Sequence, residues 1–382
     1  MPSERLRLFA LQMVFGLNAV GLAVWFPRIP DVKAALDLDV LTLALCLFGL
    51  PAGTMLGFIS VSRITARIGV KAACTWGGSA FLVSFIGPAL APNAPALAAA
   101  LFVCGLTTAT IEVAMNAKAS QTERATGRRI MTRCHAFWSF GTVTGALIGG
   151  GFAQWGTPFL AQQLLVQPLF AAATIVMARL LIADDPATGV EPERGYVLPS
   201  GMLLFLCLVP VGALLIEGAM MEWSALLLRE HVGASPFATA ATFAAFAMAM
   251  ALTRLAGDRL AELFGPRPVI VVSALIMGAA MLVFGLSPSL WVSVPAALAV
   301  GVGCGNVYPL AMSMVGQIPG ARPERNVATL ALIAFTAFLI GPPLIGVTAN
   351  AFGLPLALAM LAPLGLVPLV LMPRRMAAAQ PQ

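Results

Sequence analysis

Four long stretches of this 382-residue chain contain no Asp, Glu, Lys or Arg. They run over 72–111, 136–178, 268–321 and 326–373. A helix needs roughly 20 apolar residues to cross a bilayer, and each stretch is about twice that length. Their hydrophobicity is continuous, unlike the alternating pattern of the strands in a membrane β-barrel. The sequence therefore predicts an all-α membrane protein.

Turn-forming residues interrupt each of these stretches near its middle, so each is predicted to be a helical hairpin. The interruptions lie at 91–95, 154–158, 287–289 and 350–355. Shorter apolar runs that each fit one helix occupy 8–27, 40–62, 195–216 and 232–253. Four hairpins and four single helices predict twelve transmembrane helices.

The positions of the charged residues support this topology. Charged residues make up 10% of the chain, against about 25% in a soluble domain. Of the 22 Lys and Arg residues, only Arg28, Lys33 and Arg229 fall on one side of a twelve-helix arrangement. Positive residues gather in cytoplasmic loops, so both termini are predicted to be cytoplasmic. We interpret the net charge of +6 as a topology signal, with no nucleic-acid partner expected.

The most polar connection begins at Asp184 and follows the sixth predicted helix. It divides the chain into a six-helix bundle at 1–182, a cytoplasmic connecting loop at 183–200 and a second six-helix bundle at 201–382. An offset of 196 residues relates the two bundles: Arg63 aligns with Arg259, and Gly69 with Gly265. The bundles are therefore predicted to be pseudo-symmetric repeats, an architecture common in transporters.

The repeated loops, 62–71 and 258–267, resemble the signature loop of the major facilitator superfamily. Five further segments are similar to a bacterial inner-membrane subgroup that includes rhizopine-transport-type proteins, and more distantly to fucose–proton symporters. These segments are 112–116, 135–139, 217–224, 254–259 and 341–346. The resemblance implies solute transport by alternating access in the bacterial inner membrane, with helices 1, 4, 7 and 10 lining a central cavity.

Acidic side chains inside the apolar runs are the candidate proton carriers. They are Glu112 in the fourth predicted helix, and Glu217 and Glu222 in the seventh. An ionisable group at membrane depth costs about 2.5–3.5 kcal/mol or more, so it usually serves a function. Glu112 and Glu217 are predicted to couple transport to protons, and His135 is a candidate proton relay because imidazole titrates near neutrality. For Glu112 the alternatives are a fixed ion pair with a nearby arginine and a helix-packing hydrogen bond. For Glu222 and His135 the alternative is a location at the membrane interface.

Uncharged polar and aromatic residues are the candidate solute ligands. They are Asn18, Asn116, Trp138, Trp223, Asn306 and Tyr308, together with the acidic residue Glu222. Side-chain amides can bind the hydroxyl groups of a polyol, and indole rings can stack on a sugar; hydrogen bonds between helices and aromatic packing are the alternatives.

Arg63, Arg67, Asp258 and Arg259 are predicted to form a cytoplasmic gate of charge pairs.

Glycines recur every fourth residue at 49, 53 and 57 and again at 141, 145 and 149. Such stripes allow close helix packing. By the family resemblance, these helix faces meet the other bundle, where smooth contacts would permit rocking; static packing is the alternative.

The favoured function is secondary active transport of a small polar, sugar- or polyol-like solute, with proton symport. A proton-driven exporter of amphipathic compounds, a facilitator and a non-transporting sensor are the alternatives. No phosphate-binding loop and no zinc-protease or serine-hydrolase motif occurs in the sequence, so an ATP-driven pump or an enzyme is not expected. Free cysteines, no metal, no cofactor and a monomer are predicted.

Overall fold

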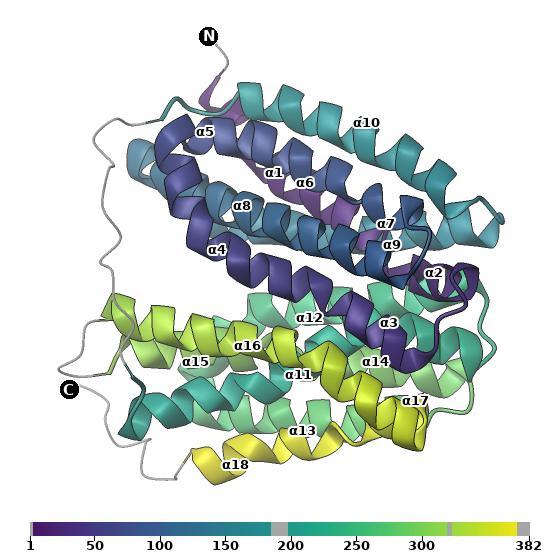
Figure 1. Cartoon of the computed structure of the whole chain (residues 1–382). Helices are drawn as coiled ribbons and strands as arrows, with labels where there is room; N and C mark the ends of the chain where they lie inside the picture. The colour runs from purple at the N-terminus through teal and green to yellow at the C-terminus, as the bar shows by residue number, and fades with distance from the viewer. Residues whose placement is uncertain (1–2, 185–197, 319–322, 373–382) are drawn as a thin grey trace. The chain divides into compact units, whose positions relative to one another are not determined.

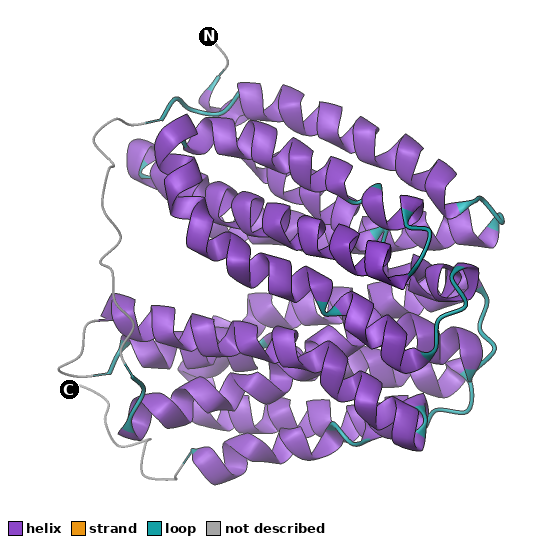
Figure 2. Ribbon diagram, in the orientation of Figure 1, coloured by secondary structure: helices purple, strands orange, loops and turns teal. Residues whose placement is uncertain are grey.

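The computed structural model describes residues 3–184, 198–318 and 323–372, and the regular elements in these ranges are helices (Figure 2). The predicted connecting loop at 183–200 lies mostly outside the described residues. The chain divides into two compact units: unit 1 is Met1–Val190 with Ser235–Ala244, and unit 2 is Glu191–Ala234 with Ala245–Gln382. The predicted bundle boundaries stay a prediction.

In its described residues up to 184, unit 1 contains ten α-helices and two short segments of other helix types, labelled in part in Figure 1. In chain order they are α1 (Glu4–Ala23), η1 (Phe26–Arg28), α2 (Ile29–Ala35), α3 (Val40–Leu47), α4 (Gly49–Ile68), α5 (Val70–Ala72), η2 (Ala73–Gly77), α6 (Gly78–Ser84), α7 (Gly87–Leu90), α8 (Ala94–Thr126), α9 (Met131–Gln154) and α10 (Phe159–Arg179).

Unit 2 contains the remaining helices, with α12 shared because its residues up to Ala244 group with unit 1. They are α11 (Gly201–Glu230), α12 (Pro236–Phe264), α13 (Pro266–Gly285), α14 (Leu290–Gly305), α15 (Val307–Gly316), α16 (Pro323–Phe352), α17 (Leu354–Ala359), η4 (Ala362–Leu366) and α18 (Val367–Leu371).

All four predicted hairpin turns are confirmed, because helices end and begin at each of them. The turn before α8 shows the local cause. Asn93 adopts an extended backbone, and its side chain accepts a hydrogen bond from the N–H of Ala96 at 3.0 Å. This cap satisfies one of the free donors of the first helical turn. Helix α8 then continues for 33 residues and ends at Gly127, whose φ of +67° suits glycine.

Eleven helical segments of the described chain are long and apolar enough to cross a membrane. The remaining predicted span corresponds to α9, which has 24 residues but falls outside these eleven. Its many Gly, Ser and Thr residues lower its hydropathy. Its length of about 36 Å would still cross a hydrocarbon core of about 30 Å. Twelve spans and cytoplasmic termini therefore stay predictions.

Gly69 and Gly265, which the internal repeat aligns, end α4 and α12 in the same conformation. Their φ angles are both +83°, and their ψ angles are 157° and 153°. Each is followed by a basic residue that holds the end of its unit's last helix. Lys71 Nζ donates to the carbonyl of the last residue of α10 at 2.9 Å and to a carbonyl two residues later at 2.8 Å. Arg267 Nε donates to the carbonyl that follows α18 at 2.8 Å. The sequence repeat therefore corresponds to equivalent structural positions.

The glycine stripes pack inside unit 1. A Cβ at Gly57 of α4 would lie 2.6 Å from the Cβ of Ala109 in α8, and one at Gly149 of α9 would lie 2.6 Å from the carbonyl oxygen of Val24. Helix α4 thus lies against α8, and α9 lies against α1 (Figure 1). This corrects the expectation that the stripes serve contacts with the other bundle. Their space is used for static packing within one unit.

A buried charge cluster joins three helices at the predicted cytoplasmic end of unit 1. Lys118 of α8 is fully buried, and its Nζ lies 2.8 Å from Oδ1 of Asp184. Both carboxylate oxygens of Asp184 also accept the backbone N–H of Lys71, at 3.0 Å. Gly69 leaves room for this carboxylate, since a Cβ there would lie 2.6 Å from Oδ2. Asp184 therefore ties the chain after α10 to the start of α5 and to α8.

The packing at Gly149 predicts a position-specific effect of a larger side chain. Gly149→Leu should lower the thermal unfolding midpoint of the purified protein in detergent, because overpacking against Val24 costs ~2 kcal/mol. Gly151→Leu on the same helix is the matched control, since no atom lies within 4 Å of a Cβ there. Equal midpoints for the two variants would contradict the close contact between α9 and α1.

Breaking the buried pair should be costly and partly reversible. Asp184→Asn leaves the Lys118 ammonium buried without a counter-charge, and we expect a loss of about 3 kcal/mol of stability. The double variant Lys118→Met/Asp184→Asn should recover part of this loss in the same unfolding measurement. Arg128→Gln, which removes the exposed pair with Glu4, should leave the midpoint unchanged. A double variant no more stable than Asp184→Asn would disprove the charge effect.

Candidate functional site

Glu112 and Asn116 lie one turn apart on the same face of α8, as the sequence predicts. Both side chains are half-buried, and Nδ2 of Asn116 donates to the backbone carbonyl of Glu112 at 2.8 Å. The Glu112 carboxylate itself has no ion pair or hydrogen bond with any described residue. A carboxylate near the middle of a 33-residue apolar helix therefore stands without a charge partner.

Glu217 forms an ion pair with an arginine of the next long helix. Its two carboxylate oxygens lie 3.4 and 3.3 Å from Nη2 of Arg254 in α12. The Glu217 side chain is 15% exposed, and that of Arg254 is 37% exposed. The geometry brings one acid of α11 and one base of α12 together, a pairing that the sequence does not predict.

Two residues of the α14–α15 segment lie close to this pair. Sγ of Cys304 lies 3.9 Å from the carbonyl of Ala213, one turn before Glu217 on α11. Asn306 interrupts the helix between α14 and α15, and its side chain lies against Gly257, three residues after Arg254. Asn306 is 2% exposed, and its Nδ2 has no acceptor among the described residues. Helices α11, α12 and α14 therefore converge around Glu217 and Arg254.

Glu222 and Trp223 follow on α11 and point in different directions. The Glu222 side chain is half-buried and forms no ion pair or hydrogen bond within the described ranges. Trp223 is fully buried, and its Nε1 finds no acceptor there. Five residues separate Glu217 from Glu222, about 140° around the helix, so the two acids do not share one face.

The predicted residues of α9 and α15 are accessible to different degrees. His135 is exposed, and its ring lies edge-on to Phe15 at 5.6 Å between centroids. Trp138 and Tyr308 are both half-buried. Helical spacing puts Trp138 about one turn after His135. These three rings keep accessible surface, as a solute-binding or proton-relay role requires.

Asn18 lies in a different environment. It is fully buried, its Nδ2 donates to the carbonyl of Val14 at 2.8 Å, and its Oδ1 has no donor among the described residues. It faces α6 and α10, because a Cβ at Gly78 would lie 3.3 Å from this oxygen and 3.1 Å from Cγ2 of Thr174. Asn18 is therefore part of a buried polar seam between helices of unit 1.

The predicted gate residues lie at the ends of α4 and α12 that are expected to be cytoplasmic. The side chains of Arg63, Arg67, Asp258 and Arg259 are all exposed. Within the described part of each unit, none of the four forms an ion pair. The buried charge in this region is instead Lys118, paired with the half-buried Asp184. The count of Lys and Arg residues treats Lys118 only as a topology marker and so does not predict this pair.

Arg28 is the second feature that sequence reasoning misses. Its Nη1 donates to Oε1 of Gln162 at 2.6 Å, Nη2 donates to the carbonyl of Thr157 at 2.9 Å, and Nε lies 2.6 Å from Oδ2 of Asp31. The guanidinium also lies over the ring of Phe159, 5.3 Å from its centroid. The signal in the sequence is a set of glutamines in an apolar run, at 162, 163 and 167, all fully buried.

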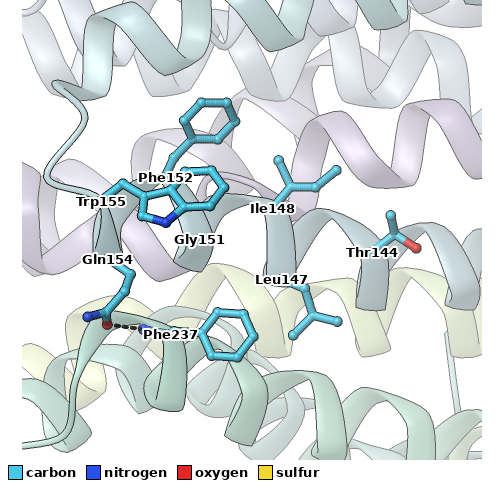
Figure 3. Close-up of a pocket in the computed structure, with 8 residues that line it drawn as sticks. All are labelled: Thr144, Leu147, Ile148, Gly151, Phe152, Gln154, Trp155 and Phe237. Atoms are coloured by element: carbon cyan, nitrogen blue, oxygen red, sulfur yellow. Dashed lines mark hydrogen bonds between the residues drawn. The ribbon is translucent and has the colours of Figure 1, made fainter.

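A hollow of about 560 Å³ lies within unit 1 at the end of α9. Figure 3 shows its mainly apolar lining and the hydrogen bond from the N–H of Phe237 to Oε1 of Gln154, 3.3 Å long. None of the predicted site residues lines it. Its lining residues are Thr144, Leu147, Ile148, Gly151, Phe152, Gln154, Trp155 and Phe237.

The described part of the chain contains no cluster of residues that could bind a metal ion. No three His, Cys, Asp or Glu side chains gather there closely enough to hold a metal ion. All six cysteines are free and buried.

Solved structures of transporters share this fold. The nucleoside transporter NupG matches with a TM-score of 0.76 at 11% identity, over 98% of this chain and 99% of that chain. A D-xylose–proton symporter matches with a TM-score of 0.76 at 12% identity, over 96% of each chain. A variant of the E. coli fucose–proton symporter FucP matches with a TM-score of 0.64 at 16% identity, over 99% of this chain and 100% of that chain.

Sequence comparison gives relatives over most of the chain. An uncharacterized transporter of Sinorhizobium fredii is 31% identical, over 88% of this chain and 89% of its own. An uncharacterized MFS-type transporter of Yersinia pestis is 30% identical, over 91% and 90%. Membrane protein MosC of Rhizobium meliloti is 26% identical, over 96% and 89%. Residues 206–381 also match the Major Facilitator Superfamily. The chain thus belongs to the major facilitator superfamily, as the loop motifs predict, and is a multi-pass membrane transporter.

Proposed function

We propose that the protein is a proton-coupled symporter that moves a small polar, sugar- or polyol-like solute across the bacterial inner membrane by alternating access. Family membership supports secondary transport. Two of the structural neighbours are named as sugar–proton symporters, which supports this solute class and this coupling ion. Twelve spans, cytoplasmic termini and a monomeric state are parts of the same proposal.

The observation that carries the proposal is the unpartnered Glu112 carboxylate in α8. An ionised carboxylate in a low-dielectric environment without a counter-charge is strongly disfavoured, so binding a proton stabilises it. When water reaches Glu112, it stabilises the ionised carboxylate, and the proton can leave. A change in access to Glu112 would thus load and release a proton on opposite sides of the membrane, which is the physical requirement for coupling.

The remaining polar residues fall into two groups in this proposal. We retain Asn116, Trp138, Glu222 and Tyr308 as solute ligands, because each keeps accessible surface. Asn18, Trp223 and Asn306 are buried among side chains, so we assign them to helix packing. His135 is retained as a proton relay, and Glu217 as a second coupling acid whose charge is held by Arg254.

The gate consists of four charged residues at the ends of α4 and α12. Arg63, Arg67, Asp258 and Arg259 are exposed at helix ends and carry charges of both signs. We propose that they form charge pairs in the conformation that is closed to the cytoplasm and separate when it opens. Such exposed pairs are individually weak, so a gate built from them can open without a large barrier.

Glu112→Gln provides the direct test. In proteoliposomes with an imposed inward proton gradient, the wild-type protein should accumulate at least one radiolabelled sugar or polyol from a panel. Glu112→Gln should abolish accumulation yet retain exchange of that solute across the membrane, because a neutral amide cannot release a proton. Glu262→Gln, an exposed acid of α12, is the matched control and should accumulate solute normally.

Other outcomes would redirect the assignment. Solute flux that persists without a proton gradient, is unaffected by Glu112→Gln and leads to no accumulation would indicate a facilitator. Outward movement of amphipathic dyes, with no polar solute transported, would identify the exporter. If nothing on either panel moves in either direction, the transport proposal is rejected.

A further inference from the structure

The guanidinium of Arg254 has hydrogen-bonding capacity that its pairing with Glu217 leaves unused. Both Glu217 oxygens approach the same nitrogen, Nη2, at 3.4 and 3.3 Å. Charge-assisted hydrogen bonds are usually about 2.7–2.9 Å long and, between arginine and a carboxylate, often involve two nitrogens. Nε and Nη1 of Arg254 have no hydrogen bond to any residue in the described ranges. One edge of the guanidinium is therefore open.

Arg28 shows how the same chain holds an arginine whose role is structural. All three of its side-chain nitrogens have partners, two of them at 2.6 Å, and its side chain is 4% exposed. Arg254 differs on each count: one nitrogen is engaged, the contacts are longer, and 37% of the side chain is exposed. This difference indicates that Arg254 can bind a ligand through the nitrogens that have no partner among the described residues.

The surroundings of Arg254 contain few other charges. Glu217 is the acid that faces it from α11, and Cys304 approaches the same stretch of α11 from α14. Glu222 lies about 140° around α11 from Glu217. On α16, the residues that pack against α11 near this level, Phe338 and Gly341, do not ionise. Asp258, one turn after Arg254 on α12, is exposed and forms no ion pair with a described residue. Among the described residues, Arg254 is therefore in direct contact with one carboxylate, that of Glu217.

We infer that the transported solute carries a carboxylate, which binds to the open edge of Arg254 in competition with Glu217. The inference rests on the proposed transport function and narrows its solute class to small carboxylates such as sugar acids. The planar guanidinium fork matches carboxylate geometry and distinguishes it from an uncharged hydroxyl.

Competition for one guanidinium also gives a reason for proton symport. Two carboxylates beside a single arginine leave one negative charge uncompensated, which is costly at membrane depth. Protonation of Glu217 removes that charge and transfers Arg254 to the solute. The solute anion and one proton then move together, and the charge of the site stays balanced.

The test uses solutes that differ mainly in a carboxylate. Gluconate is compared with sorbitol, and glucuronate with glucose, in binding to the purified full-length protein and in uptake by proteoliposomes. The carboxylate of at least one pair should bind and be transported, and its uncharged counterpart should not. Arg254→Lys keeps the charge but loses the fork, and should weaken carboxylate binding about tenfold or more. Arg124→Gln, on the exposed surface of α8, should bind as wild type does.

Glu217→Gln separates competition from simple structural support. With the competitor neutralised, carboxylate binding should be at least as tight as in the wild type. A Glu217→Gln protein that unfolds at the wild-type midpoint yet binds no carboxylate would overturn the inference. Carboxylate binding that is unchanged in both Arg254→Lys and Arg254→Gln would also overturn it.

The outcomes distinguish this inference from the function on which it rests. Proton-driven uptake of sorbitol or glucose that does not require Arg254 would reject the carboxylate assignment and leave the symporter proposal intact. Absence of any solute uptake under a proton gradient would reject both. Uptake of gluconate or glucuronate that requires Arg254, with a folded Arg254→Lys variant, would support both.

Discussion

The absence of water from the bilayer interior is the constraint on which this structure depends. Backbone groups that cannot bond to water must bond within their own segment, so apolar runs of this length become helices. For apolar side chains, lipid is as favourable an environment as the protein interior, so the hydrophobic effect does not drive helices together. They associate instead through close packing of small residues. The stripes at 49–57 and 141–149 meet this requirement inside unit 1, where α4 packs on α8 and α9 packs on α1.

The absence of water also determines which charged residues need a partner inside the protein. Lys118 and Arg28 are buried, and each has close partners: Asp184 for the first, and Gln162, the Thr157 carbonyl and Asp31 for the second. Glu112 has no partner among the described residues, and Arg254 has one distant partner and an open edge. Fully satisfied charges hold a membrane fold together, whereas unsatisfied charges are costly unless a proton or solute completes them. This division underlies both proposals.

Much of the fold could be predicted because its signals are local. Charge-free runs, turn residues such as those at 91–95 and the positive-φ glycine at 69 act over a few neighbouring residues, and all four hairpin turns are confirmed. The candidate site could be predicted only as a set of residue types. Glu217 was recognised as an acid at membrane depth, but its pairing with Arg254, 37 residues away in the chain, depends on how α11 and α12 pack. Glycine spacing likewise predicts close packing without naming the partner helix.

The linear order of residues is enough to predict a helical membrane protein with repeated loops at 62–71 and 258–267, because hydrophobicity, turn chemistry and the 196-residue offset can be read from it. Which polar groups are satisfied depends on how the helices pack. The tertiary structure buried Asn18 and Asn306, paired Lys118 with Asp184 and left one edge of Arg254 open. The physical reason is that the energy of a polar group in a low-dielectric interior depends on partners brought within about 3 Å, and helix packing alone supplies those partners.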